Sequence, residues 1–335
     1  MPASAEIFHM LLAYKKSALL RSGIELGVFA HLAERPGTAA DVAAELGLAP
    51  RGTRLLLNAL VAIDVLEESD GRYRLTGWAA ETLDPAREGY VGELSRILTS
   101  TWEWEAMGRL SEAVRLGGPV IAENAEHLDY GYYEEFATHA GAVTRPTVAT
   151  MADVLDDWAT GRESLDVLDL ACGHGMYGFT LAERHPQARI WSVDNPRVLE
   201  IAQKHAARVG VADRVHTMPG DMFSMELGGP YDLVLITNVL HHHTPERATE
   251  LLRRVAAVTR PGGRIVLVGI TADDGPVRLS PEAHLFSLLM LVWTENGEAH
   301  SAGTYERMLT AAGYTGMRLH RQLSVPMRVI VAERR

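Results

Sequence analysis

Residues 165–178 read LDVLDLACGHGMYG and decide the fold. An apolar stretch runs directly into Gly173, Gly175 and Gly178, which have the spacing Gly-x-Gly-x-x-Gly. Glycines at this spacing let the backbone turn tightly, and they let backbone amides approach a ligand where side chains would block it. The stretch therefore predicts a buried strand, a nucleotide-cofactor loop and the start of a helix.

Two carboxylates accompany this loop. Asp194 closes the next predicted strand, about 20 residues after the glycines, which is the distance at which an acidic side chain meets ribose hydroxyls in such folds. Asp169 stands at the start of the loop, where a carboxylate suits a cation better than the pyrophosphate that helix N-termini bind. Both aspartates are therefore predicted cofactor ligands.

The rest of the chain alternates strands and helices. Further strands are predicted at residues 215–218 and 231–237, after Arg260-Pro-Gly-Gly, and at residues 316–322 and 326–332 as a final pair. This order predicts an α/β fold with a Rossmann-like, doubly wound sheet and an antiparallel edge.

The N-terminal part has the pattern of a winged helix-turn-helix. Residues 5–32 are apolar at helical spacing, two shorter helical segments follow, and residues 66–75 form two strands around Asp70-Gly71. The predicted recognition helix carries Arg51 and Arg54, but Glu67 and Glu68 beside it would repel phosphate. We therefore expect a dimerisation scaffold rather than a DNA-binding module.

Composition limits the class of partner and the compartment. The 335 residues carry a formal charge of -11, which disfavours a nucleic-acid partner and favours a small-molecule substrate. A single cysteine, Cys172, suits a reducing cytosol, and we interpret it as a small packing residue beside the cofactor. No stretch approaches the roughly 20 apolar residues of a membrane span, so we expect a soluble, cytoplasmic protein without a membrane partner.

Three parts are predicted along the chain. They are a winged-helix dimerisation domain at residues 1–88, a helical linker that roofs the pocket at residues 89–157, and a cofactor domain at residues 158–335. The linker gathers aromatic side chains, which favour a core or dimer interface: Trp102, Trp104, Tyr130, Tyr132, Tyr133 and Phe136. Arg145 is either a ligand for a substrate carboxylate or a solvated side chain, and Met290 is a second candidate for substrate contact.

With these parts, nearly the whole chain resembles the plant and bacterial small-molecule O-methyltransferases. The resemblance rests on the loop at residues 171–178, on Asn238-Val-Leu-His-His, on Arg260-Pro-Gly-Gly-Arg and on Phe286-Ser-Leu-Leu-Met-Leu. It implies S-adenosyl-L-methionine as cofactor and a homodimer whose helical N-terminal parts interlock.

The resemblance also implies roles for individual residues. Gly173 and Gly175 would bind the methionine moiety and Asp194 the ribose. The adenosine ligands would be Asp221, Met222, Phe223 and Thr237. His241 would remove the proton from the substrate hydroxyl while carboxylates fix its tautomer, and His242 is the second candidate base.

The chain departs from the family pattern at four positions. Gly269 and Ala299 stand where family members carry glutamates, so the base lacks its expected orienting carboxylates. His243 and His300 stand where relatives have aromatic residues, and two more imidazoles around one cavity suggest a divalent metal such as zinc or iron.

Three functions follow from these observations. The leading hypothesis is metal-assisted C-methylation of a small 2-oxo acid through its enolate, because a branch of this fold carries out that reaction. The alternative is O-methylation of a phenol or hydroxyl by His241 or His242. A winged-helix regulator that senses the cofactor would need a basic DNA-binding face, which the sequence lacks.

Overall fold

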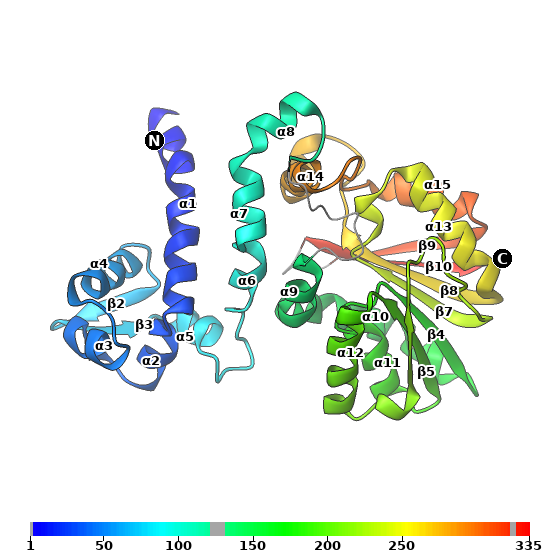
Figure 1. Cartoon of the computed structure of the whole chain (residues 1–335), viewed down its shortest axis with the longest axis horizontal. Helices are drawn as coiled ribbons and strands as arrows, with labels where there is room; N and C mark the ends of the chain where they lie inside the picture. The colour runs from blue at the N-terminus through cyan, green and yellow to red at the C-terminus, as the bar shows by residue number, and fades with distance from the viewer. Residues whose placement is uncertain (1–2, 121–130, 322–325) are drawn as a thin grey trace. The chain divides into compact units, whose positions relative to one another are not determined.

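The computed structural model describes residues 3–120, 131–321 and 326–335 (Figure 1). Contacts divide the chain into two compact units, Met1–Glu103 and Trp104–Arg335, and each is described by itself. Tyr130 of the predicted aromatic cluster and Gln322 of the predicted penultimate strand lie outside the described residues.

The first unit is a winged helix. Its elements are α1 Ala3–Glu25, α2 Val28–Glu34, β1 Gly37–Thr38, α3 Ala39–Glu45, α4 Pro50–Val61, β2 Leu66–Ser69, β3 Arg72–Leu75, α5 Gly77–Leu83 and α6 Leu94–Leu98. The strands form a sheet in the order β1-β3-β2, and β1 is a strand that the sequence did not predict. Phe29, Leu57 and Leu60 are almost completely buried in the core of this unit.

The predicted helical segment at residues 5–32 is interrupted. Gly27 has a φ of 72°, a left-handed conformation that ends α1 and caps α2. Glycine adopts this conformation without the steric penalty of a Cβ atom, so a single residue redirects the chain.

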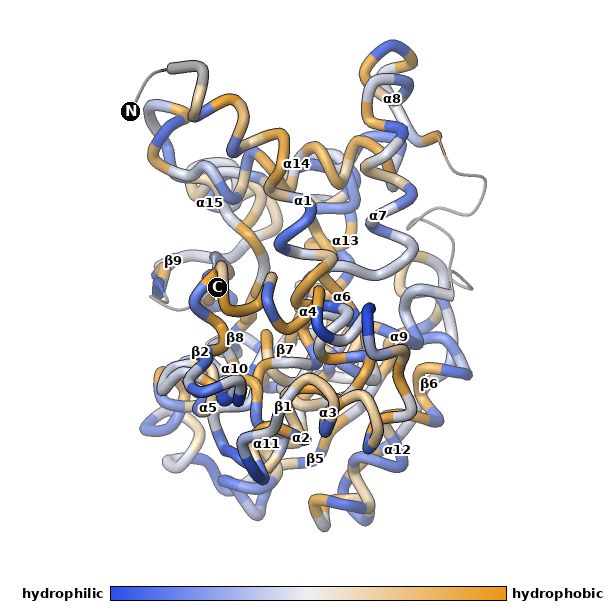
Figure 2. The backbone as a smooth tube through the Cα atoms, turned by 90° about the vertical axis from the view of Figure 1, so that its left-hand side faces the viewer, coloured by the Kyte–Doolittle hydropathy of each residue, from blue (hydrophilic) through white to orange (hydrophobic). Residues whose placement is uncertain are grey.

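Helix α1 exposes large apolar side chains. Ile7, Phe8, Met10, Leu11 and Tyr14 are each more than half exposed within the single chain, and Figure 2 shows apolar segments recurring along this helix. A contiguous apolar face of this kind usually marks a protein–protein contact.

The second unit is an α/β sandwich. The helix α7 Thr101–Gly108 crosses the boundary between the units, and the helices that follow are α8 Leu110–Leu116, α9 Tyr132–His139, α10 Gly141–Thr160, α11 Met176–Arg184, α12 Pro196–Val209, α13 Pro245–Val258, α14 Pro281–Trp293 and α15 Ala302–Ala311. The strands are β4 Leu165–Leu170, β5 Ala188–Asp194, β6 Val215–Pro219, β7 Tyr231–Thr237, β8 Thr259–Ile270, β9 Tyr314–Arg321 and β10 Met327–Arg334.

These strands form one sheet in the order β6-β5-β4-β7-β8-β10-β9. The five strands β4 to β8 pair in parallel, whereas β10 runs antiparallel to β8 and β9 antiparallel to β10. The predicted doubly wound sheet with an antiparallel edge is confirmed. Strand β8 begins at Thr259, so Pro261 and Gly262 lie within it rather than before it.

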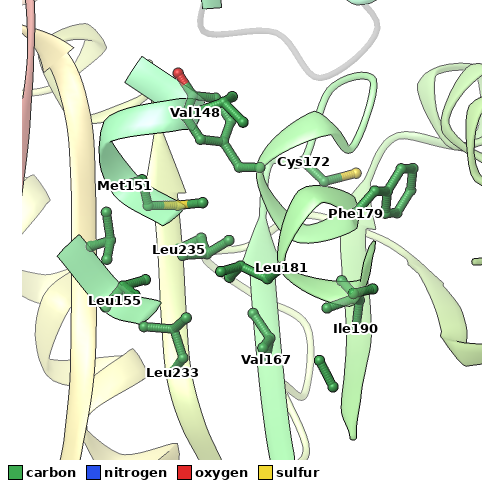
Figure 3. Close-up of a cluster of buried hydrophobic side chains, with 14 of the residues drawn as sticks. Val148, Met151, Leu155, Val167, Cys172, Phe179, Leu181, Ile190, Leu233 and Leu235 are labelled. Atoms are coloured by element: carbon green, nitrogen blue, oxygen red, sulfur yellow. The ribbon is translucent and has the colours of Figure 1, made fainter. Parts of the chain in front are cut away.

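Helices cover both faces of the sheet. On one face α10, α11 and α12 pack over a core in which Met151, Leu155, Val167 and Leu233 are fully buried (Figure 3). On the other face α13 and α15 pack over a second core. Burial of each large aliphatic side chain contributes roughly 1.5–3 kcal/mol, so these layers fix the strands and align their carboxyl ends.

The amino end of the sheet is held by ion pairs. Asp232 on β7 accepts hydrogen bonds from Arg162 (2.9 Å) and Arg260 (2.6 Å), and Arg260 also pairs with Asp166 on β4 (3.1 Å). Across the described ranges, the chain contains no helix with the length and hydropathy needed to span a bilayer.

The exposed face of α1 predicts a dimer that charge substitution will disrupt. Phe8 and Leu11 lie three residues apart and therefore on one side of the helix. Each contributes roughly 1.5–3 kcal/mol when buried, so replacing both by Asp should raise the dimer dissociation constant at least about a hundredfold. Sedimentation equilibrium should then show the 36.7 kDa single chain.

Arg51→Asp is the control, because it adds an acid at an exposed polar position on α4. A wild-type protein that sediments as a single chain at micromolar concentration would contradict the prediction.

Candidate active site

The cofactor loop leaves β4 through alternating left-handed residues. Ala171, Gly173 and Gly175 have φ values of 53°, 56° and 77°. The amide of Cys172 donates to the Val193 carbonyl on β5 (3.0 Å), which ties the loop to the neighbouring strand. A positive φ at a non-glycine residue costs roughly 1–2 kcal/mol, so the position of Ala171 is imposed by its surroundings.

The three glycines of the motif are required for three different reasons. A Cβ at Gly178 would lie 2.8 Å from Asp169 Oδ2, so this glycine allows α11 to approach β4. A Cβ at Gly175 would lie 2.2 Å from the Phe179 ring. At Gly173 a Cβ would meet nothing within 4 Å, which leaves the backbone there open to a ligand.

Asp169 supports the loop from inside. It is fully buried, its Oδ2 accepts the Gly178 amide (3.2 Å), and its Oδ1 has no hydrogen-bond partner among the described residues. Burial raises the pKa of this carboxyl to about 8, so it is mainly protonated at neutral pH. Such a group is poorly suited to offer a negative charge to a cation, although it was predicted for that role.

Asp194 occupies the end of β5 beside the loop. Its Oδ2 accepts the Gly173 amide (2.9 Å) and its Oδ1 accepts the Asn195 amide (2.8 Å). Each oxygen keeps a second lone pair for an incoming hydroxyl. Burial raises the pKa of Asp194 to about 6, so the carboxylate is present at neutral pH but only narrowly.

His174, which the sequence did not single out, connects the loop to α10. Its Nδ1 accepts the Met176 amide (3.2 Å), so its proton lies on Nε2, which donates to Thr144 Oγ1 (3.3 Å). Burial lowers the pKa of His174 to about 4, which keeps the ring neutral. A histidine between two glycines of a cofactor loop is the only signal that could have identified it.

The expected adenine segment is a tight turn. Asp221 Oδ1 accepts the Phe223 amide (2.9 Å) and Oδ2 accepts the Ser224 hydroxyl (3.1 Å). The Phe223 ring lies under the Arg247 guanidinium (4.0 Å to the ring centroid) and contacts His243 edge-on (4.9 Å between centroids). The His243 ring therefore packs against this turn.

The segment after β7 carries the catalytic candidates. Thr237 ends β7 in a buried position, and Asn238 turns the chain with a φ of 57°. Because β4 and β7 are adjacent parallel strands, Asn238 and the cofactor loop lie at the same edge of the sheet.

His241 lies in the 3₁₀ turn Leu240–His242 and is only 4% exposed. Its ring meets Phe286 of α14 at a right angle (4.8 Å between centroids) and lies 4.6 Å from the His242 ring. Its Nδ1 is buried and has no hydrogen-bond partner among the described residues. The backbone position that faces Nδ1 is Gly269, where a Cβ would lie 3.4 Å away.

Burial keeps the whole histidine cluster neutral. It lowers the pKa of His241 well below its ordinary value, that of His242 to about 3 and that of His243 to about 4. The neighbouring imidazoles disfavour protonation further, and beside His243 the Arg247 guanidinium acts in the same direction. Cys172 is also buried, and its thiol pKa is raised well above the ordinary value, so it is no nucleophile.

The histidines do not assemble the predicted metal site. His300 Nε2 donates to the carbonyls of Leu240 (3.2 Å) and His243 (3.0 Å), so this nitrogen carries a proton and cannot ligate a metal. The His243 ring packs on Phe223 instead. In the ranges that the structure describes, no three His, Cys, Asp or Glu side chains converge as a metal would require.

The other candidates have different surroundings. Arg145 is exposed on α10, Met290 is 1% exposed on α14, and the Ala299 amide donates to Ser287 Oγ (3.1 Å). None of these observations assigns a substrate contact.

The loop fits S-adenosylmethionine. Gly173 leaves an open backbone, Asp194 offers carboxylate lone pairs beside it, and Met222 and Phe223 supply apolar surface at the neighbouring strand end.

Comparison with known proteins identifies the family. A model of the O-methyltransferase domain matches residues 149–315, and a model of the O-methyltransferase dimerisation domain matches residues 8–84. The solved structure of a Nostoc punctiforme protein described as an O-methyltransferase superimposes with a TM-score of 0.92 at 31% identity, covering 100% of both chains. The chain belongs to the O-methyltransferase family.

Two curated relatives span nearly the same length. The tetracenomycin polyketide synthesis 8-O-methyl transferase of Streptomyces glaucescens is 29% identical over 93% of this chain and 92% of its own. The L-tyrosine C(3)-methyltransferase of Streptomyces lavendulae is 28% identical over 88% of this chain and 82% of its own. A solved family member holds S-adenosylmethionine. S-adenosylmethionine is therefore also the cofactor of this methyltransferase.

The geometry of Asp194 predicts how the cofactor binds. Asp194→Ala should weaken S-adenosylmethionine binding by roughly 2–3 kcal/mol, the cost of losing a charged hydrogen-bond partner. Because the pKa of Asp194 is raised to about 6, wild-type affinity should also decline as the pH falls below 6, approaching about tenfold per pH unit.

Isothermal titration calorimetry between pH 5 and pH 8 measures both effects. Asp194→Asn preserves the shape without the ionisation, so it should remove the pH dependence in this range. Unchanged affinity in Asp194→Ala would refute the assignment of this carboxylate to the ribose.

Proposed function

We propose that this O-methyltransferase transfers the methyl group of S-adenosylmethionine to the hydroxyl of a small phenolic or enolic acceptor that lies against His241. The observation that carries the proposal is the position of this ring at the carboxyl edge of the sheet, in the segment that follows the strand next to the cofactor loop. The bound cofactor supplies an electrophilic methyl group on a sulfonium.

The surroundings of His241 favour an aromatic acceptor. Phe286 meets His241 at a right angle, and Tyr133 lies near the adjacent His242 ring (6.4 Å between centroids). Aromatic side chains prefer such edge and tilted contacts with other rings, and they exclude water. Bulk solvent is thereby kept from competing with the acceptor for the methyl group.

The relatives support the same acceptor class. One is named for O-methylation in polyketide synthesis, and the other is named for methylation at C3 of tyrosine, which is a phenol. An ionised phenol carries negative charge on its oxygen and on the adjacent ring carbons, so one orientation against His241 directs transfer to oxygen and another to carbon. We place oxygen first, because the family model is that of an O-methyltransferase.

Metal-assisted C-methylation of a 2-oxo acid takes second place. That reaction needs side chains that hold a metal at the acceptor, whereas His300 donates to backbone carbonyls and His243 packs on Phe223. The hydroxyl acceptor requires only groups that the structure brings together.

A panel of phenols, naphthols, hydroxyquinones and 2-oxo acids tests this proposal. We expect methyl transfer to aromatic or enolic hydroxyls, with the methyl group located on oxygen by NMR of the product. His241→Ala should lower kcat/KM by about 10- to 150-fold, as expected for the loss of a hydrogen bond to a charged group.

His284→Ala is the control, because His284 is an exposed histidine on α14. Methyl transfer to 2-oxo acids alone, with deuterium exchange beside the ketone, would favour the metal-assisted reaction instead.

Removal of metal ions gives an independent prediction. Because the histidines engage carbonyls and rings, dialysis against a strong chelator should change kcat/KM by less than about twofold. Loss of turnover that zinc or iron restores would contradict this expectation, and metal analysis of untagged protein would then identify the ion.

A further inference from the structure

We propose that the acceptor of this O-methyltransferase is an acidic hydroxyl, such as an enol or phenol conjugated with a carbonyl group, which binds already ionised. His241 then donates a hydrogen bond to the acceptor oxygen through Nε2 and does not remove its proton. This inference rests on the proposed function and names the substrate class of the same site.

The observation that carries it is the buried Nδ1 of His241. An imidazole that serves as a general base needs an acceptor at its second nitrogen, because the proton on that nitrogen must be hydrogen-bonded both before and after the base is protonated. Nδ1 has no partner among the described residues, and the position that faces it is Gly269, which has no side chain to offer.

Among the residues that the structure describes, the neighbours of the ring supply no carboxylate. The titratable groups that face it are His242 and His243 from its own segment, His300 from the loop before α15, and Tyr305 of α15. Tyr305 Oη lies 3.9 Å from the point where a Cβ of residue 269 would stand. Phe286 of α14 also contacts the His241 ring, and its apolar ring offers no hydrogen-bond acceptor.

This environment selects one tautomer. With its proton on Nε2, the ring buries only a lone pair at Nδ1. The other neutral tautomer and the protonated ring would both bury an N–H donor without an acceptor, and orphaned buried donors are rarer than orphaned acceptors. His241 is therefore arranged to donate from Nε2.

Methyl transfer to an ionised acceptor needs no base. A lone pair of the acceptor oxygen forms the new bond to the methyl carbon, and the electron pair of the breaking carbon–sulfur bond goes to sulfur. The products are a neutral methyl ether and S-adenosylhomocysteine, and no proton is released in the step. An ordinary phenol, with a pKa of about 10, is scarcely ionised at neutral pH and would lack this route.

The pH dependence of kcat/KM distinguishes the two mechanisms. The probes are 2-hydroxy-1,4-naphthoquinone, which is acidic, 2-naphthol, which has similar size and ordinary acidity, and a series of nitrophenols of intermediate acidity. We expect the inflection of kcat/KM to move with the pKa of each acceptor, and the quinone to exceed 2-naphthol at least about a hundredfold at pH 7.

An inflection that stays at one pH for every acceptor would overturn the inference and leave the proposed function standing. Failure to methylate any hydroxyl, although S-adenosylmethionine binds, would instead overturn the proposed function.

Substitution at Gly269 tests the structural cause. Gly269→Asp places a carboxylate within reach of Nδ1 and should raise kcat/KM for 2-naphthol at least tenfold, with an inflection that no longer follows the acceptor. Gly269→Asn has the same shape without the charge and should give no such gain. An equal response of the two variants would contradict the role assigned to Nδ1, and if Gly269→Asp fails to fold, the wild-type acceptor series still decides.

Discussion

Two sharp left-handed turns at the carboxyl ends of adjacent parallel strands determine where the cofactor loop and the histidine segment of this O-methyltransferase lie. Ala171 after β4 and Asn238 after β7 both adopt positive φ values, although neither is glycine. The left-handed conformation costs roughly 1–2 kcal/mol at Ala171 and less at Asn238, because asparagine tolerates it, and the two buried cores that fix the strands supply far more than this. Because each strand turns directly after its last residue, the cofactor loop and the histidine segment begin at the same edge of the sheet.

Much of this arrangement could be predicted from the sequence because its signals are local. Apolar strands, a glycine motif and an acid about 20 residues further on are all consecutive features, and they predicted β4, β5 and the position of Asp194. The break at Gly27 was not predicted, since apolar spacing alone continues through it. A single glycine can either sit within a helix or end it, and the choice depends on tertiary packing.

The metal hypothesis shows what a sequence cannot predict. His243 and His300 were grouped because imidazoles are good ligands, but a ligand also needs a free nitrogen aimed at a common point. The structure gives His300 Nε2 to backbone carbonyls and the His243 ring to Phe223, and among the described residues no three potential ligands converge on one point. Hydrogen bonds to carbonyls from a distant segment leave no trace in residue types, so the same histidines are compatible with either arrangement until the fold is known.

Electrostatics connects the histidine segment to the chemistry. His241, His242 and His243 all have lowered pKa values and are uncharged at neutral pH. Asp169 is also mainly neutral, because burial raises its pKa to about 8. Apart from the Arg247 guanidinium on Phe223, the sulfonium of the bound cofactor would be the positive charge at this edge, and in a site of low dielectric it attracts an anionic oxygen more strongly than it would in water. A neutral ring that donates one hydrogen bond can orient such an anion without competing for its charge. Gly269 and the Nδ1 of His241, which has no partner in the described part of the chain, create this arrangement.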